Sequence, residues 1–441
     1  MPLLCYNPHY ENPPPAMHAL LNAPALKGYP KAPLKALATS LFKAHQKTPF
    51  AYASLDAWVE LVRERYTALM SAPLKPLYNA TGVLLSTNLG RACLEPSHLK
   101  ELELLSGYIN LEVDHRGKRA DRCALVQELL KMLFSAEDAL VLNNNASALV
   151  LVASVFAPKA QGCETLLSYG QLVEIGGHFR AHELLECVTN LKFVGSTNKT
   201  YLQDYQHALS PNTTLITTIH LSNFVQQGFV ASVGTKELYK LATERGVLFY
   251  EDLGSLQSIM QVQTALKHAH LLSFSTDKLF GSVQGGVVLG AKEAICQLAK
   301  HPLYRAFRAD KIQLYMLARS LQEHISGQAN PTQRFLEQDK DTLLNKALKL
   351  LQLLKGVQAT LIETTALVGG GVADSGMKSF GLLLSPPSDF QELHHALYQQ
   401  GLACVLRHDG VLLDTFALFD KDLHAIAKIL NSTINRHQPH P

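Results

Sequence analysis

Short apolar runs of four or five residues recur through the middle of the chain, and helical stretches separate several of them. Runs of this length are typical of buried strands, and their alternation with helices indicates a mostly parallel sheet. The predicted strands are residues 139–142, 165–168, 191–194, 214–218, 247–250, 271–275 and 286–289. We therefore predict a large α/β domain over residues 78–312.

A smaller α/β domain is predicted over residues 313–441, where long helical patterns precede two more apolar runs and an amphipathic helix. These last elements are strands at residues 380–384 and 411–413 and a helix over residues 423–432. We expect the functional site to lie between the two α/β domains, because ligand sites favour such boundaries.

Residues 1–77 differ in composition from the rest of the chain. They hold eleven of the twenty prolines, and amphipathic patterns at 33–46 and 54–70 predict helices between them. Eight Lys and Arg against four Asp and Glu give this segment a net charge of +4, whereas the whole chain carries +3. We predict a small helical domain, whose basic character fits contact with RNA phosphates and fits an ordinary solvated face equally well.

Composition restricts the class of protein. The 441 residues are 47% hydrophobic and 17% charged, which is ordinary for a globular protein of two or three domains. No apolar run reaches the ~18 to 20 residues of a transmembrane helix, and the N-terminus lacks a signal-peptide pattern. The seven cysteines are dispersed without a Cys-x-x-Cys pair, so we expect reduced thiols, no metal site and a cytoplasmic protein.

The strand predicted at 271–275 leads to a candidate for chemistry, Lys278. A glycine-rich run over residues 281–286 follows it, and glycine lets the backbone approach a flat ligand closely. This layout fits a lysine that forms a Schiff base with pyridoxal phosphate (PLP), although for the segment taken alone a surface lysine is the favoured interpretation.

Two further segments favour the cofactor interpretation. Asn144, Asn145 and Ala146 follow a predicted strand and begin a helix, whose N-terminus can seat a phosphate or can be simply a capped helix end. Asp252 ends another strand, where an acid can pair with a pyridinium nitrogen or merely occupy a loop. The order of phosphate seat, acid and lysine resembles the aspartate-aminotransferase-like PLP fold, with a large mostly parallel sheet domain and a small C-terminal domain.

Longer motifs resemble one family, bacterial selenocysteine synthase (L-seryl-tRNA(Sec) selenium transferase). Residues 78–92 match its N-A-T-G…T-N-L-G-R-A block, and residues 275–286 match S-x-D-K-L-x-G-x-x-Q-x-G. Residues 172–180, 222–229 and 301–311 match three more blocks. The similarity runs from roughly residue 17 to the last helix, and it is weaker in the N-terminal domain.

The resemblance implies roles for four residues near the lysine. Lys278 would hold PLP and move protons, and Asp252 would pair with the pyridinium nitrogen. Ser275 stands where this fold often places a hydroxyl on the cofactor phosphate. Asp277 matches the family's acid, which could assist proton transfer at a substrate hydroxyl or could orient Lys278 or bridge to another chain.

Five arginines are candidate anion receptors, because guanidinium groups bind phosphate and selenophosphate with two hydrogen bonds. A surface ion pair is the alternative for each one taken singly. Arg305 and Arg308 lie three apart on a predicted helix and should face one way. The five are Arg91, Arg119, Arg122, Arg305 and Arg308.

The activity implied by the resemblance is PLP-dependent conversion of seryl-tRNA(Sec) to selenocysteinyl-tRNA(Sec) through an aminoacrylyl intermediate, with selenophosphate as selenium donor. A homo-oligomer built from dimers, in some relatives a ring, is implied as well. The alternatives are a related PLP-dependent lyase or aldolase acting on a small amino acid or amino-sugar phosphate, and a tRNA-binding protein without turnover.

This chain departs from the family pattern around the expected cofactor pocket. Thr276 replaces a glycine, Val283 a proline and Ala120 a glycine, and the D-L-G-S-G-S-L motif that begins at Asp252 is shortened. The arginine of a C-terminal L-D-L-R pattern is absent, because Phe416 stands in its place. A divergent homologue with weakened transferase activity is therefore a further alternative.

Overall fold

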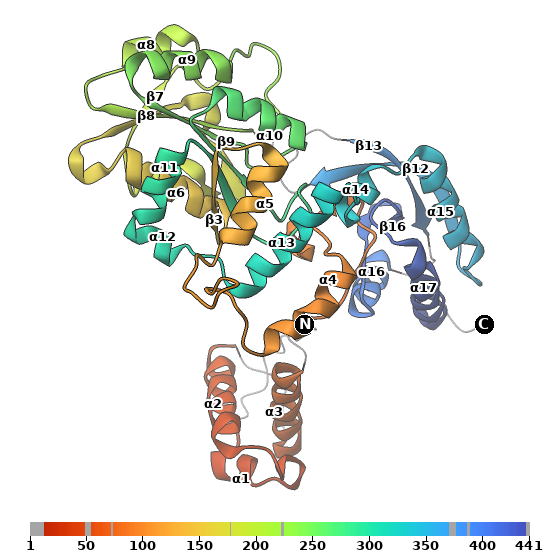
Figure 1. Cartoon of the computed structure of the whole chain (residues 1–441). Coiled ribbons are helices and arrows are strands. Elements are labelled where there is room, and N and C mark those ends of the chain that lie inside the picture. The colour runs from red at the N-terminus through yellow and green to blue at the C-terminus, as the bar shows by residue number, and fades with distance from the viewer. Residues whose placement is uncertain are drawn as a thin grey trace. The chain divides into compact units, whose positions relative to one another are not determined.

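The structure is a computed structural model that describes residues 13–48, 54–71, 74–176, 178–221, 225–369, 376–385 and 389–437. The chain divides into two compact units, Met1–Pro76 and Leu77–Pro441. Figure 1 shows the fold of each unit, coloured from the N-terminus to the C-terminus. Within the described residues, no helix is both long enough and apolar enough to cross a membrane.

The first unit is a small helical bundle in which α2 and α3 pack side by side (Figure 1). The side chain of Trp58 is buried and meets the rings of Phe42 and His45 edge to face. Ser54 caps α3 by accepting a hydrogen bond from the Ala57 N–H at 3.2 Å. The two predicted helices are thus confirmed. The elements are α1 (Met17–Leu21), α2 (Lys31–Lys47) and α3 (Leu55–Met70).

The second unit contains a large mixed sheet. Among the described residues it has seven strands in the order β3-β11-β10-β9-β8-β4-β7, and β11 runs antiparallel to both neighbours while the others are parallel. Every strand predicted for this region is confirmed. The strands are β3 (Asp138–Leu142), β4 (Glu164–Ser168), β7 (Asn190–Val194), β8 (Thr213–Ile219), β9 (Leu248–Asp252), β10 (Leu271–Ser275) and β11 (Gly286–Gly290).

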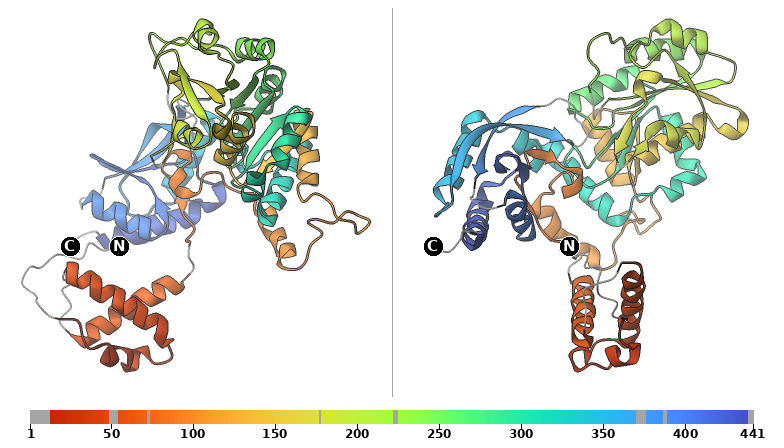
Figure 2. Two further views of the ribbon diagram at one scale, coloured as in Figure 1. Left: turned by 90° about the vertical axis from the view of Figure 1, so that its left-hand side faces the viewer. Right: turned by 180° about the vertical axis from the view of Figure 1, so that it is seen from behind.

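Helices cover both faces of this sheet (Figure 2). Alternate side chains of a strand point to opposite faces, so in β3 Val141 joins one apolar core while Leu140 joins the other. The first core includes α5 (Ala124–Phe134), α8 (Leu202–Ala208), α9 (Thr235–Arg245), α10 (Ile259–Ala265) and α13 (Lys311–Ser326). The second includes α6 (Asn145–Phe156), α7 (Ala181–Glu186), α11 (Lys292–Lys300) and α12 (Pro302–Ala306).

A second sheet lies in the C-terminal half, with the order β15-β16-β13-β12-β2 for the described part of the chain. Residues 78–85, which the sequence grouped with the large domain, pair instead with C-terminal strands, because β1 joins β14 and β2 joins β12. The two predicted C-terminal strands and the closing helix are confirmed.

The strands of this part are β1 (Tyr78–Asn79), β2 (Val83–Leu85), β12 (Ala359–Gly369), β13 (Met377–Leu384), β14 (Leu402–Ala403), β15 (Val405–Arg407) and β16 (Gly410–Asp414). Its helices are α14 (Pro331–Leu336), α15 (Lys340–Gln352), α16 (Phe390–Gln399) and α17 (Leu423–His437). The remaining elements of the second unit are α4 (Pro96–Glu101) and a small hairpin of β5 (Glu174–Gly176) and β6 (Phe179–Arg180).

Candidate active site

The sheet brings the predicted acid and lysine to one edge. β9 and β10 are parallel neighbours, and Asp252 at the end of β9 is in register with Ser273 of β10. The Ser275 N–H donates to the Gly254 carbonyl at 2.9 Å, which holds the two strand ends together. Lys278 follows directly, so the structure places Asp252 and Lys278 at the carboxyl ends of adjacent strands, where α/β enzymes bind ligands.

Asp252 is a buried carboxylate with donors on one side. The Asn145 side-chain amide donates to its Oδ1 at 2.8 Å, and the Gly254 N–H donates to the same oxygen at 2.9 Å. Burial raises the pKa of Asp252, while the Asn145 amide, the Gly254 N–H and the charge of Lys278 act in the opposite direction. A cationic ligand group beside this carboxylate would therefore stabilise its ionised form.

Lys278 is largely buried, and burial lowers the pKa of its amine. The nearby guanidinium of Arg91 acts in the same direction, whereas the negative charges of Asp252 and Asp277 oppose the shift. A lowered pKa leaves more neutral amine at neutral pH, which is the form that attacks a carbonyl or accepts a proton.

Asp277 connects the lysine loop to the segment that carries Arg91. Arg91 Nη1 lies 2.5 Å from Asp277 Oδ2, and the Ser275 hydroxyl donates to Asp277 Oδ1 at 2.9 Å. The Ala92 N–H also donates to the Asp277 carbonyl at 3.3 Å. Because the Ser275 proton is directed at Asp277, a role for Ser275 at a cofactor phosphate stays a prediction.

The start of α6 has the geometry of an anion seat. Asn144 Oδ1 caps the helix by accepting from the Ser147 N–H at 2.8 Å, and the Asn145 amide is directed to Asp252. The side chains of Asn144 and Asn145 are thus engaged within the protein. The backbone N–H groups of Asn145 and Ala146 remain for an anion, since a helix gives the N–H groups of its first turn no acceptor of its own.

Gly286 lets β11 pass close to this helix start. A Cβ at this position would lie 2.3 Å from the Asn144 carbonyl oxygen and 2.9 Å from the Asn145 nitrogen. The close approach that glycine permits here is therefore to the backbone of the anion seat itself.

Four of the five predicted arginines line a single cavity of ≈540 Å³, together with Lys300; they are Arg119, Arg122, Arg305 and Arg308. We call it the arginine cavity. Glu112 accepts from Arg308 Nη2 at 2.8 Å and lies 3.9 Å from Arg122 Nη1. The Phe307 carbonyl accepts from the Asn143 N–H at 2.8 Å, which ties the cavity wall to the anion seat.

The prediction that one helix holds both Arg305 and Arg308 is correct for Arg305 and wrong for Arg308. α12 ends at Ala306, where Phe307 forms its C-cap, so Arg308 lies beyond the helix. Both arginines still line the arginine cavity. Arg91 is not among the lining residues, and its described partner is Asp277.

Two departures from the family pattern contact each other. The Thr276 hydroxyl donates to the Val283 carbonyl at 2.6 Å, and the Thr276 N–H donates to the Gly285 carbonyl at 3.0 Å. The substituted residues therefore close the loop around Lys278 rather than open it. Phe416, in place of the expected arginine, is fully buried in an apolar cluster with Phe335.

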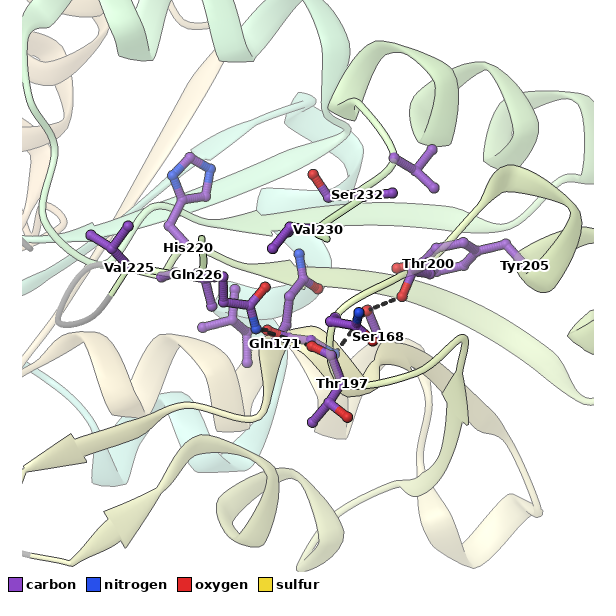
Figure 3. A pocket seen from close by; sticks show the side chains of 16 residues that line it. Ser168, Gln171, Thr197, Thr200, Tyr205, His220, Val225, Gln226, Val230 and Ser232 are labelled. Carbon is purple, nitrogen blue, oxygen red and sulfur yellow. Dashed lines mark hydrogen bonds between the residues drawn. The ribbon is translucent and has the colours of Figure 1, made fainter. Parts of the chain in front are cut away.

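Sequence reasoning missed a second cavity of ≈360 Å³ at the ends of β4 and β8 (Figure 3). His220 follows β8, lines this cavity, and lies 2.8 Å from Glu251 through its Nε2 atom. Its position just after a predicted strand, at the same sheet edge as Asp252, was the available signal. Part of the family block at residues 222–229 borders this region, but residues 222–224 lie outside the described residues.

The strand order, with one antiparallel strand inside a parallel sheet and a lysine and an acid at neighbouring strand ends, defines an α/β fold of the aspartate-aminotransferase type. The solved structure of D-glucosaminate-6-phosphate ammonia-lyase shares this fold, with a TM-score of 0.62 and 16% identity over 85% of this chain and 98% of that chain. The predicted fold class is thus confirmed.

The family is shown by sequence. Residues 77–419 match the sequence model described as SelA: L-seryl-tRNA selenium transferase. The L-seryl-tRNA(Sec) selenium transferase of Campylobacter jejuni serotype O:6 is 35% identical over 96% of this chain and 98% of its own length. Those of Campylobacter fetus and Wolinella succinogenes are each 36% identical over 85% of this chain and 87% of their own length. The chain belongs to the L-seryl-tRNA selenium transferase family.

Proposed function

We propose that this protein converts seryl-tRNA(Sec) to selenocysteinyl-tRNA(Sec) with PLP as cofactor and selenophosphate as selenium donor. The observation that carries the proposal is the pair of Asp252, at the end of β9, and Lys278, just beyond the end of the neighbouring β10, in a chain that matches the transferase family over residues 77–419. In the net reaction the seryl β-carbon exchanges its C–O bond for a C–Se bond, and selenophosphate becomes phosphate.

The residues present fit PLP. Lys278 would hold the cofactor through its amine, Asp252 would face the pyridinium nitrogen, and the first turn of α6 would bind the phosphate. The raised pKa of Asp252 supports this arrangement, because the pyridinium proton would supply the positive charge that favours the ionised carboxylate. When bound, PLP supplies an electron sink for the negative charge that develops on the α-carbon.

The chain's own side chains would carry the proton transfers. With its lowered pKa, the Lys278 amine can accept the α-proton. Asp277, which is held by Arg91 and Ser275, would assist loss of the β-hydroxyl. The arginine cavity would bind selenophosphate, since its guanidinium groups match a tetrahedral dianion.

Two further parts of the proposal concern assembly and tRNA. The helical N-terminal domain, over residues 1–77, would contact tRNA phosphates through exposed lysines of α2, such as Lys35 and Lys43. We also propose a dimer-based homo-oligomer and the division of the rest near residue 312 into a large and a C-terminal domain, with residues 78–85 joining the C-terminal domain. Light scattering of the purified protein tests the assembly, and a monomeric mass would contradict it.

The test of the function is Lys278→Ala, with Lys236→Ala on the exposed face of α9 as matched control. We expect Lys278→Ala to lose both conversion of seryl-tRNA(Sec) and the visible absorption of lysine-bound PLP, whereas Lys236→Ala keeps both. Retained conversion in Lys278→Ala would sink the assignment. The lyase alternative would be favoured if Lys278→Ala lost the PLP absorption while the wild type left seryl-tRNA(Sec) unchanged and released ammonia from a small amino acid.

A further inference from the structure

The second cavity lies at the same sheet edge as the proposed active site. Ser168 at the end of β4 and His220 after β8 both line it, and its volume of ≈360 Å³ is within the about 300 to 1,000 Å³ of small-ligand pockets. We call it the neutral cavity, because none of its described lining residues is an Asp, Glu, Lys or Arg. The arginine cavity, by contrast, presents four guanidinium groups.

The lining of the neutral cavity consists of amides, hydroxyls and aliphatic groups, as Figure 3 shows for Gln171, Thr197, Val230 and Ser232, together with the rings of Tyr205 and His220. Such a lining disfavours a phosphate or carboxylate, which would lose hydration without gaining a countercharge. It fits an uncharged, flat ligand that can hydrogen-bond at its edge and contact apolar groups on its face.

Gln171 indicates which hydrogen-bonding groups the edge of this flat ligand carries. Its Oε1 atom is buried and has no hydrogen-bond partner in the described part of the chain, whereas the Gln226 amide already donates to the Thr197 carbonyl at 3.0 Å. An unpaired buried acceptor costs about 1 to 3 kcal/mol, so a turn of the Gln171 side chain that brings its Oε1 atom, which now has almost no exposed surface, to a ligand donor in the cavity is favoured. Gln side chains pair with adenine through its N6 amino group and N7 atom, and Val225 and Val230 are available to contact the base face.

The position of the neutral cavity agrees with this ligand. The His220 N–H donates to the Asp252 carbonyl at 2.9 Å, so a residue of the cavity wall is bonded directly to the strand that carries the acid. β8 adjoins β9, and β4 adjoins β8, so at about 4.8 Å per strand the cavity begins about 5 to 10 Å from the Asp252 strand. An amino acid esterified to a terminal ribose places the adjoining base within such a distance of the reacting carbon.

We propose that the neutral cavity receives the 3′-terminal adenosine of the aminoacyl-tRNA, with Gln171 hydrogen-bonding the adenine edge and the hydroxyls of Thr197 and Ser232 available to the ribose. This inference rests on the proposed function, because a substrate esterified to tRNA is what brings an adenosine to this edge. The two cavities would then separate the substrates by charge. The uncharged adenine base would enter the neutral cavity, and the selenophosphate anion would enter the arginine cavity.

Three variants test the inference by steady-state kinetics with seryl-tRNA(Sec). Gln171→Ala removes the hydrogen-bonding amide, Val230→Trp fills the cavity, and Gln399→Ala removes an exposed glutamine of α16 as matched control. We expect KM for seryl-tRNA(Sec) to rise about tenfold in Gln171→Ala, with kcat nearly unchanged, because one lost hydrogen bond of about 1.4 kcal/mol is a tenfold change in affinity. Val230→Trp should raise KM at least as much, because the indole takes the space of the base. The control should match the wild type.

A second readout changes the ligand instead of the protein. The probe is the seryl amide of 3′-amino-3′-deoxyadenosine, titrated into PLP-loaded protein, beside the same compound with purine in place of adenine. The wild type should bind the purine compound about tenfold more weakly, and Gln171→Ala should bind the two equally. Equal affinity in the wild type, with wild-type KM in Gln171→Ala and Val230→Trp, would overturn the inference while leaving the proposed function intact. A wild type that converts no seryl-tRNA would overturn the proposed function and this inference with it.

Discussion

Substitution of Gly286 by alanine tests the geometry of the proposed phosphate seat. Gly286 begins β11, which is held between β10 and β3. β11 therefore cannot shift away from the start of α6 to relieve a clash at Gly286. The new Cβ would lie 2.3 Å from the Asn144 carbonyl oxygen and 2.9 Å from the Asn145 nitrogen, and both are backbone atoms. Overpacking costs about 1 to 3 kcal/mol, and we expect about 3 kcal/mol here because the strain falls on backbone rather than on a flexible side chain.

The same displacement moves the first turn of α6. We therefore expect the PLP affinity of Gly286→Ala to fall at least about tenfold, which is a loss of about 1.4 kcal/mol at the seat. Denaturant unfolding measures the stability, and absorbance titration of the apoprotein with PLP measures the affinity.

Gly107→Ala is the matched control. Gly107 has a φ of −97° and no atom within 4 Å of the position of a Cβ, so alanine fits there without strain. We expect this variant to match the wild type or to gain about 0.4 to 1 kcal/mol, because alanine restricts the unfolded chain. Wild-type stability together with wild-type PLP affinity in Gly286→Ala would refute the close approach of β11 to the seat.

Three other predictions address the charged groups of the site. Asp277→Asn removes the charge that faces Arg91, and kcat should fall about a hundredfold in conversion kinetics if Asp277 assists proton transfer; an unchanged kcat would leave it a positioning role. Burial raises the pKa of Asp252, so its ionisation destabilises the folded apoprotein at neutral pH. Asp252→Asn should therefore raise the apoprotein's thermal midpoint at pH 8, and this gain should shrink toward pH 5, nearer the ordinary carboxyl pKa of about 4. A gain in thermal midpoint that does not change with pH would contradict the raised pKa. Replacing Arg305 and Arg308 by Gln should raise KM for selenophosphate at least about a hundredfold, since each charged hydrogen bond contributes about 1.5 to 3 kcal/mol. Dehydration of the seryl group in the absence of selenophosphate should continue in this variant. Equal loss of dehydration and of selenocysteine formation would argue against selenophosphate in the arginine cavity.

The strands of the large sheet could be predicted because each is a continuous apolar run. β12 was missed, since Glu363 and three threonines interrupt its apolar residues and leave no continuous apolar run. The pairing of residues 78–85 with C-terminal strands could not be predicted either, because it joins segments that are hundreds of residues apart. The pattern of apolar and polar residues predicts local structure, whereas tertiary packing decides which strand pairs with which.

The candidate site shows the same division. Lys278 and Asp252 were found because strand ends are where such groups are placed in α/β proteins. That the Asn145 amide would be directed to Asp252, and the Ser275 hydroxyl to Asp277, depends on side-chain geometry that no motif encodes. The neutral cavity was missed because its walls come from three segments that are separate in the sequence, those that follow β4, β7 and β8, and its signal is an unpaired Gln171 oxygen that exists only in the folded chain.

The most direct test of the proposed function is identification of the product. PLP-loaded protein is incubated with serine-charged tRNA(Sec), with and without selenophosphate, and the aminoacyl group is then released and identified. We expect selenocysteine when selenophosphate is present, and pyruvate from the dehydrated seryl group when selenophosphate is withheld. Unchanged serine under both conditions, in protein whose PLP is bound through Lys278, would contradict the proposed function.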